Sequence, residues 1–538
     1  MSEHLVDALF PAATGPRVAG VPDLIETTRT RDGVRGEFLG AGAAALLVLA
    51  AFAVPQMASE SWRESLFAGA APLFAWWSPH IGWGTVPAVV LAAAVVTQGP
   101  ALAQRLSWRP LLGAGYLTAL GWALALALVD GWERGVTARL ADGHEYLTEV
   151  PGVTDIPLML DTFADRILDG QPDSWTTHVS GHPPGALLFF VLLDRLGLGG
   201  PTWAGVVCVL IGCSAPIAVA VALRALGSED RARAALPFLV LAPAAIWIAV
   251  SADAMFAGVT AWAVASLAVA ASTGTRYTAT RRETDVTLSA RPGTDPGAPG
   301  VRGGTTASAS EPGVDEHEEA DVTTAVSRPA GRREAVATAT AAPGRWAGAP
   351  AAGASGILFG FGIYLNYGLV LMGFMAVAVL VAARTVRPLL PAVLGALIVV
   401  AAFTAAGFWW FDGYHLVVER YYQGIATDRP YGYWWWGNLA ATVCAVGLAT
   451  AAALSRALAP ARLRVFEPGS LLVAAGLCAI VAADISGLSK AETERIWLPF
   501  DLWLLAATAY LPQVRARPWL AVQAAAALVL VHLLMTNW

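Results

Sequence analysis

The sequence holds few charged residues and almost no lysine. Asp, Glu, Lys and Arg make up 14% of the 538 residues, whereas a soluble chain carries about 25%. Lys490 is the single lysine, so the rest of the Lys and Arg total is arginine. The formal net charge is −6, which gives no electrostatic basis for binding nucleic acid. The shortage of charge argues against a soluble protein, and the sign of the net charge argues against a nucleic-acid partner.

Cysteine is scarce as well, and several common sequence signatures are missing. The four cysteines all lie inside apolar runs, a placement typical of core packing and not of a disulfide framework or a zinc site. The polar first 36 residues lack the pattern of a cleaved signal peptide, so none is expected. No glycine-rich phosphate loop follows a strand, which argues against a cytoplasmic nucleotide-sugar enzyme.

Long apolar runs dominate what remains. Hydrophobic residues make up 56% of the chain, and its mean hydropathy is +0.56. A helix needs about 20 residues to cross the hydrocarbon core of a bilayer. We therefore predict an all-α polytopic membrane protein with about 13 transmembrane helices and with juxtamembrane helices on the outer face. The expected spans lie near residues 37–55, 81–97, 111–129, 203–224, 234–250, 254–272, two short spans within 351–383, 389–408, 437–455, 469–487, 497–511 and 518–534.

Arginines in the short loops set the expected orientation. They fall almost wholly on one side of the predicted spans, and the positive-inside rule assigns that side to the cytoplasm. The N-terminus is then cytoplasmic, and the chain is expected in the plasma (inner) membrane. Three loops are expected on the outer face, at 130–200, 409–436 and 488–496.

The predicted organisation has four parts. A cytoplasmic tail covers 1–36, and transmembrane modules cover 37–272 and 348–538. Between the modules, residues 273–347 are rich in Thr, Ser, Ala, Gly and Pro and show no apolar periodicity. This composition predicts a disordered cytoplasmic insert.

Two shorter helices are expected in the outer loop 130–200. Apolar residues recur at helical spacing between Asp155, a favourable N-cap, and Gly170. This pattern predicts an amphipathic helix that lies along the membrane surface or packs on its own loop. The apolar segment from Pro184 to Leu198 is too short for an ordinary span and is expected to be interfacial or re-entrant.

Ionisable residues in the outer loops are candidates for chemistry on an anionic, membrane-held substrate. A carboxylate can take the proton of an attacking hydroxyl, and Asp142, Glu145 and Asp130 compete for this role together with Asp155. Cations from another loop, such as Lys490, can stabilise the charge that grows on a leaving phosphate. The sequence thus favours a transferase site on the outer face.

Two motifs and a helical hairpin resemble the glycosyltransferase C superfamily. D-G-H-E-Y at 142–146 matches its D-x-x-x-Y element, and H-P-P-G at 182–185 matches its H-P-P element with Gly185 where leucine is usual. An arginine cluster, a span, Asp253 and another span then follow in the superfamily's order. The resemblance implies a polytopic enzyme that uses polyprenyl-phosphate sugars on the outer side. The second carboxylate at Glu145 is not adjacent to Asp142 as in the usual D-E-x-x-Y, so the identity of the base stays open.

The C-terminal outer loops carry a second resemblance. R-P-Y-G-Y-x-x-W-G-N at 429–438 and L-S-K-x-E-T-E-R-I-W-L-P-F at 488–500 are similar to actinobacterial integral membrane transferases of the cell envelope, of mannosyl-, arabinosyl- or methylthioxylosyl-transferase type. The resemblances together imply the following substrate-binding residues: His182, Asp253, Arg429, Tyr431, Lys490, Glu494 and Arg495. Other roles remain open, since His182 could cap its helix and Lys490 could belong to a salt-bridged loop.

The expected activity is therefore glycosyl transfer in the cell envelope. The donor is a polyprenyl-phosphate-linked sugar of pentose or mannose type, the acceptor is an envelope glycan or glycolipid, and membrane lipid surrounds the enzyme. No cofactor is assigned, although a divalent metal stays an option. A lipid or solute transporter (or flippase) and a non-catalytic scaffold of envelope assembly are the alternatives. No internal repeat of the kind common in transporters is found.

Overall fold

The computed structural model describes residues 30–289 and 348–537. The chain divides into two units, one formed by 1–275 with 346–538 and the other by 276–345, and only the first is considered below. Most of the predicted tail at 1–36 and of the predicted insert at 273–347 lies outside the described residues. Those two assignments therefore stay predictions.

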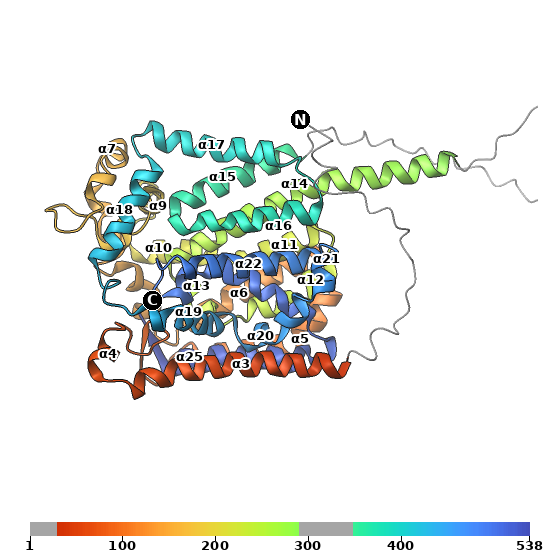
Figure 1. Ribbon diagram of the computed structural model, residues 1–538, viewed down its shortest axis with the longest axis horizontal. Helices are drawn as coiled ribbons and strands as arrows, with labels where there is room; N and C mark the ends of the chain where they lie inside the picture. Colours follow the sequence, from red (N-terminus) through yellow and green to blue (C-terminus); the bar gives the residue numbers. More distant parts are fainter. Residues whose placement is uncertain (1–29, 290–347, 538) are drawn as a thin grey trace, which may run out of the picture. The chain divides into compact units, whose positions relative to one another are not determined.

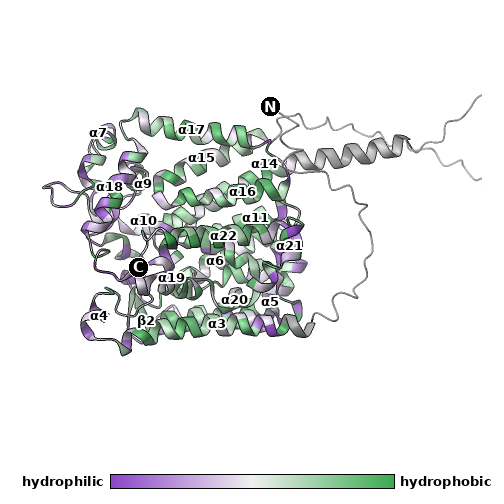
Figure 2. Ribbon diagram, viewed as in Figure 1, coloured by the Kyte–Doolittle hydropathy of each residue, from purple (hydrophilic) through white to green (hydrophobic). Residues whose placement is uncertain are grey.

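Long apolar helices make this a multi-pass helical membrane protein. Within the described ranges, seven helices are long and apolar enough to cross a bilayer, or up to nine if two bent pairs each count as one span. Hydrophobic residues occupy the middle of the helices, and hydrophilic residues collect at both ends (Figure 2). The long helices are α3 (Thr30–Met57), α5 (Thr85–Arg105), α6 (Trp108–Ala127), α10 (Pro201–Gly212) followed directly by α11 (Ala215–Ala225), α14 (Ala252–Ser289), α22 (Pro468–Ile485) and α25 (Gln513–Leu533).

The predicted count of about 13 spans is not confirmed, because several apolar runs are bent or broken. The helices α17 (Leu389–Ala405) and α18 (Trp410–Gln423) meet at 74°, and α19 (Tyr431–Val446) and α20 (Leu448–Ala457) meet at 100°. Gly447 makes the second bend with a φ of 78°, which glycine adopts without a steric penalty.

Two further predicted spans, 234–250 and 497–511, are broken segments. The first divides into α12 (Glu229–Val240) and α13 (Ala245–Ile248), and the second into α24 (Leu498–Leu504) and the 3-10 helix η7 (Leu505–Tyr510). Every residue of α24 and η7 is buried, and α12, α20 and α22 pack against them. The core of the unit therefore surrounds α24 and η7.

The apolar segment 351–383, predicted as two short spans, is broken at Asn366. The helix α15 (Ala349–Leu365) ends there, and the Asn366 side chain accepts from the Gly368 N–H at the start of η6 (Tyr367–Met372), which leads into α16 (Gly373–Ala383). A side chain at Gly356 would collide with the Ala392 carbonyl of α17. Small residues thus allow α15 and α17 to approach closely, as in other membrane helix pairs.

Short elements crowd one end of the helices, marked by α4 (Glu60–Glu64), α7 (Ile156–Asp161) and α18 in Figure 1. A small antiparallel sheet joins β1 (Ala75–Trp77) to β2 (Leu534–Thr536) near the C-terminus. The short helix expected from Pro184 is confirmed as α9 (Pro184–Arg195). We call this the α7–α18 end.

The predicted amphipathic helix at 155–170 is shorter than expected. Asp155 is the N-cap, since its carboxylate accepts from the Leu158 N–H at 3.0 Å. The helix α7 nevertheless ends at Asp161, and the 3-10 helix η5 (Ala164–Arg166) follows. Phe163 and Ile167 are buried as the pattern requires, so the pattern identified the buried face and not the length of the helix.

Arginines from loops predicted to be cytoplasmic meet at the opposite end, near α21 (Pro460–Arg464). Arg233 donates to the Ala103 and Leu106 carbonyls at 2.7 and 2.9 Å. Arg384 reaches the Val465 carbonyl at 3.4 Å. These contacts join α12 to the end of α5 and join Arg384 to the segment after α21, whereas the orientation of these loops in the membrane stays a prediction.

Candidate active site

Arg495 is the centre of a buried ionic cluster at the α7–α18 end. It lies on α23 (Thr493–Ile496) and is 4% exposed. Its Nη1 donates to Asp253 Oδ2 at 2.5 Å, and its Nη2 donates to Glu492 Oε2 at 3.1 Å. Nη2 also lies 3.4 Å from His178 Nε2. Burial opposes charge on the guanidinium, but Asp253 and Glu492 more than offset this, so the pKa of Arg495 is raised.

His178 links Arg495 to Glu145, the carboxylate of the D-G-H-E-Y element. His178 Nδ1 lies 3.2 Å from Glu145 Oε1. Because a guanidinium can only donate, Nε2 is the accepting nitrogen and Nδ1 carries the hydrogen that faces Glu145. Burial, and next the positive charge of Arg495, hold the pKa of His178 well below its usual value. We call Glu145, His178, Asp253, Glu492 and Arg495 the Arg495 cluster.

Glu145 is an unusual carboxyl because it is almost fully buried. Its exposed fraction is 3%, and burial raises its pKa to about 8, with Arg495 acting in the opposite direction. Glu145 Oε2 and Asp253 Oδ1 are both buried and have no hydrogen-bond partner in the described part of the chain. The cluster therefore encloses two carboxyl oxygen atoms that no described residue pairs.

Glu492 owes its position to a strained turn. Ala491 and Glu492 have φ values of 72° and 63°, in the left-handed region that costs energy for residues other than glycine. The turn lets Glu492 bridge two arginines, with Oε1 3.3 Å from Arg429 Nη1 and Oε2 3.1 Å from Arg495 Nη2. The salt-bridged loop left open by the sequence is thus present.

His182 opens the H-P-P element next to the cluster. Its Nδ1 donates to the His178 carbonyl at 2.7 Å, and its ring lies between Tyr146 and Phe256, with centroid distances of 5.7 and 5.6 Å. Pro183 and Pro184 then begin α9. A side chain at Gly185 would collide with the Tyr364 backbone, which explains glycine at this position.

Tyr146 is the buried anchor of the D-G-H-E-Y element, and Asp142 is its exposed end. The Tyr146 ring stacks on Phe190 at 5.1 Å. Asp142 lies at the surface, where its Oδ1 accepts from the His144 N–H at 2.9 Å. It is nevertheless close enough to Glu145 to raise the pKa of that carboxyl. Its role as the base stays a prediction.

Asp130 belongs to a separate network. Its carboxylate lies 2.8 Å from His80 Nε2 and 2.7 Å from Arg139 Nη2. Arg139 also donates to the Thr536 hydroxyl, so the network connects the loop 130–200 to the C-terminal strand β2. These contacts give Asp130 a structural role. Asp155 also has a structural role, since it is the N-cap of α7.

Arg429 and Lys490 tie three loops together beside the cluster. Arg429 donates to the Lys490 carbonyl at 2.7 Å and to the Phe67 carbonyl at 3.3 Å. Lys490 Nζ donates to the Ala426 carbonyl at 2.8 Å and lies 5.6 Å from the Tyr422 ring centroid. Burial, followed by the charge of Arg429, lowers the pKa of Lys490. Lys490 is therefore a partly exposed cation adjoining a buried one.

Glu494 and Tyr431 belong to the two C-terminal motifs but bind groups outside the Arg495 cluster. Glu494 is fully buried, accepts from the Phe74 N–H at 2.8 Å, and has a pKa raised by burial to about 7. Tyr431 donates to the Asp484 carbonyl at 3.0 Å. Both contacts join elements of the fold, so the substrate-binding role predicted for these residues gains no direct support from the geometry.

Three residues of this end were missed or undervalued in the sequence. His178 has no motif of its own, and its partner Arg495 lies 317 residues away. Glu492 lies in the predicted salt-bridged loop, but its partner Arg429 comes from another loop 63 residues away. Asn438 was named only inside a motif, yet it is buried and donates to Asp484 Oδ1 and the Ser489 carbonyl at 2.9 and 2.7 Å. The one signal for Asn438 is its place in the G-N pair after three tryptophans.

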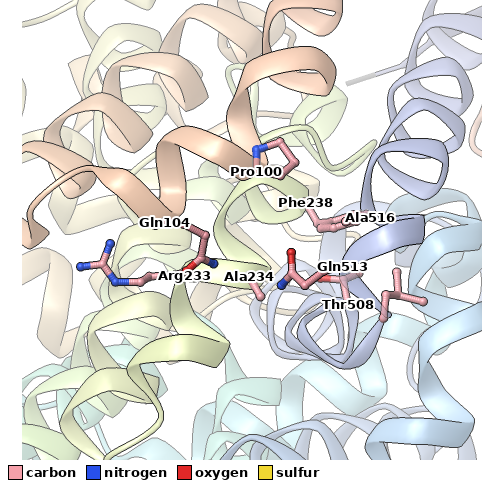
Figure 3. A pocket seen from close by; sticks show the side chains of 9 residues that line it. Pro100, Gln104, Arg233, Ala234, Phe238, Thr508, Gln513 and Ala516 are labelled. Atoms are coloured by element: carbon pink, nitrogen blue, oxygen red, sulfur yellow. The ribbon is translucent and has the colours of Figure 1, made fainter. Parts of the chain in front are cut away.

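No protein-family model, curated protein or solved structure matches the chain. In the described ranges, no group of three or more His, Cys, Asp and Glu side chains could hold a metal ion. A small pocket lined by Pro100, Gln104, Arg233 and Thr508 lies away from the Arg495 cluster and contains none of its residues (Figure 3). The Arg495 cluster is therefore proposed as the site on its own geometry.

Proposed function

We propose that the protein is a membrane glycosyltransferase. It transfers a sugar of pentose or mannose type from a polyprenyl-phosphate donor to an envelope glycan or glycolipid on the outer face of the plasma membrane. The observation that carries this proposal is the contact of four motifs in one cluster. Glu145 comes from D-G-H-E-Y, Asp253 begins α14, Arg495 ends K-x-E-T-E-R, and His182 of H-P-P adjoins them.

The energetic cost of this cluster supports a functional role. His178 and Asp253 are 317 and 242 residues away from Arg495 in the sequence, yet all three meet in a buried position. Removing charges from water costs several kcal/mol per ion, and well-packed apolar residues would often stabilise a fold equally well. Ionisable residues retained inside a membrane protein are functional-site candidates for the same reason.

The distribution of charge suits an anionic donor. Lys490 is partly exposed, and its Nζ donates to the neutral Ala426 carbonyl and lies over the Tyr422 ring. Arg429 is buried behind it. We assign the donor phosphate to Lys490, with Arg429 holding the loop, because charge that develops on a leaving phosphate is stabilised by preorganised cations.

A comparison of envelope glycans tests the proposal in the cell. A deletion strain is complemented with the wild type, with Asp253→Asn or with Asp173→Asn, whose carboxylate is exposed at the loop surface. We expect one glycosidic linkage to disappear in the deletion strain and to return with the wild type and with Asp173→Asn but not with Asp253→Asn. Unchanged glycans in the deletion strain would favour a transporter or a scaffold.

A further inference from the structure

We infer that the His182 imidazole, through Nε2, accepts the proton of the acceptor hydroxyl during transfer. The inference rests on the proposed function and assigns to a histidine a step for which the sequence motifs favour a carboxylate. It follows from the orientation of the His182 ring and from the surroundings of the carboxyl groups that compete with it as the base.

The orientation of the ring fixes its tautomer. Nδ1 lies 2.7 Å from the backbone carbonyl of His178, which can only accept, so Nδ1 carries the hydrogen and Nε2 carries the lone pair. The ring is partly exposed, and Nε2 has no hydrogen-bond partner among the described residues and is not buried. The basic nitrogen is therefore unoccupied by the described residues and is not fully enclosed by them.

The charged groups around the ring favour a neutral imidazole that can be protonated transiently. Burial lowers the pKa of His182, so the ring is neutral at pH 7 and free to accept a proton. Asp253 on α14 acts in the opposite direction, while Arg495 on α23 adds to the lowering. Tyr146 and His178 are the other titratable groups that face the ring. Asp253 thus supplies the negative charge that stabilises the imidazolium once it forms.

The competing carboxylates are less suited to this step. Asp130 and Asp253 are both engaged by arginines in ion pairs of 2.7 and 2.5 Å. Glu145 is 3% exposed, and its raised pKa leaves it largely protonated at pH 7. Asp142 lies at the surface, and its Oδ1 already accepts from the His144 N–H at 2.9 Å. Among these candidates in the described part of the chain, His182 alone combines a neutral basic atom, a fixed orientation and an Nε2 that is not buried.

The step balances as a nucleophilic substitution at the sugar. The acceptor oxygen forms a bond to the anomeric carbon while its proton moves to His182 Nε2. The bond between that carbon and the phosphate oxygen breaks, and its electron pair leaves with the polyprenyl phosphate. The imidazolium then releases its proton to water.

A matched set of variants tests the assignment in the purified full-length protein. Synthetic polyprenyl-phosphate mannose and arabinose serve as donors, and alkyl glycosides serve as acceptors. His182→Gln removes the basic nitrogen, His144→Gln changes an exposed histidine of the same loop, and Asp142→Asn removes the competing carboxylate. Loss of a positioned general base costs about 10² to 10⁴ in rate.

We expect His182→Gln to lose activity by that factor at normal protein abundance, while the control His144→Gln stays within a few fold of the wild type and Asp142→Asn, the test of the competing base, loses less than His182→Gln. The wild-type rate should fall at low pH as His182 becomes protonated, and this acidic limb should be missing from the residual activity of His182→Gln. Added imidazole should partly restore the activity of His182→Ala.

The inference is overturned if Asp142→Asn alone abolishes transfer, or if the loss in His182→Gln follows protein abundance and leaves the pH profile unchanged. A wild type that transfers no sugar would instead overturn the proposed function, and this inference with it.

Discussion

Arg495 and Asp253 form a buried ion pair that joins α23 to the start of α14 across 242 residues of sequence. Both side chains are at least 95% buried, so neither charge is compensated by bulk water. Breaking such a pair by neutralising one partner costs about 3–5 kcal/mol, because the other charge stays buried and uncompensated.

This relationship predicts strong coupling between the two residues. Asp253→Asn and Arg495→Gln should each lower the thermal stability of the detergent-solubilised protein, and the double variant should lose less than the two single losses together. Residues in direct contact show interaction energies of about 0.5–3 kcal/mol. Melting curves of the wild type, the two single variants and the double variant measure this interaction energy. Asp173→Asn, at an exposed carboxylate, is the control. Strictly additive losses would mean that the pair is not an energetic unit.

The raised pKa of Glu145 predicts that the stability of the folded protein depends on pH. Its pKa is raised to about 8 in the folded protein, against about 4.3 in an unfolded chain. The folded state therefore binds the proton more tightly, and stability falls as the pH rises from about 4 to about 8. Glu145→Gln removes this loss, so its melting temperature relative to the wild type should increase between pH 5 and pH 8. Glu133→Gln, at an exposed carboxylate of the same loop, should show no such trend, and a constant offset for Glu145→Gln would contradict the assignment.

Substitutions of Lys490 distinguish a role in donor binding from a role in loop structure. If its ammonium binds the donor phosphate, Lys490→Ala should reduce transfer by about 10² to 10³, the effect of losing one preorganised contact to developing charge. Lys490→Arg should restore only part of the rate, because a guanidinium places its charge differently. Arg387→Ala, an exposed cation of another loop, is the control in the same transfer assay. Full rescue by arginine, together with defects that follow protein abundance, would assign Lys490 to loop structure.

The helical membrane class and several local features followed from the sequence. Asp155 caps its helix, Asn366 marks a break, and α9 begins at Pro184. The number of spans did not follow, because hydropathy cannot distinguish apolar segments that face lipid from those buried within protein. The segment 497–511 is apolar throughout, yet it forms two short elements inside the core.

The site was predictable only in part for a related reason. Motif spacing identified Glu145, Asp253 and Arg495 as candidates, and the structure brings all three together. The partners of each group depend on contacts between distant loops, which spacing does not encode. Asp130 therefore seemed available as a base although His80 approaches it from another loop at 2.8 Å.

The measurement that tests the central claim most directly is sugar transfer by the purified protein in lipid vesicles. Vesicles containing the wild type, or Lys490→Ala, receive polyprenyl-phosphate mannose or arabinose and an alkyl glycoside acceptor. The account predicts a glycosylated acceptor and an equal amount of released polyprenyl phosphate with one of the two donors, and a rate lowered by about 10² to 10³ in the variant. Absence of a glycosylated product with either donor, from well-folded wild-type protein, would contradict the account.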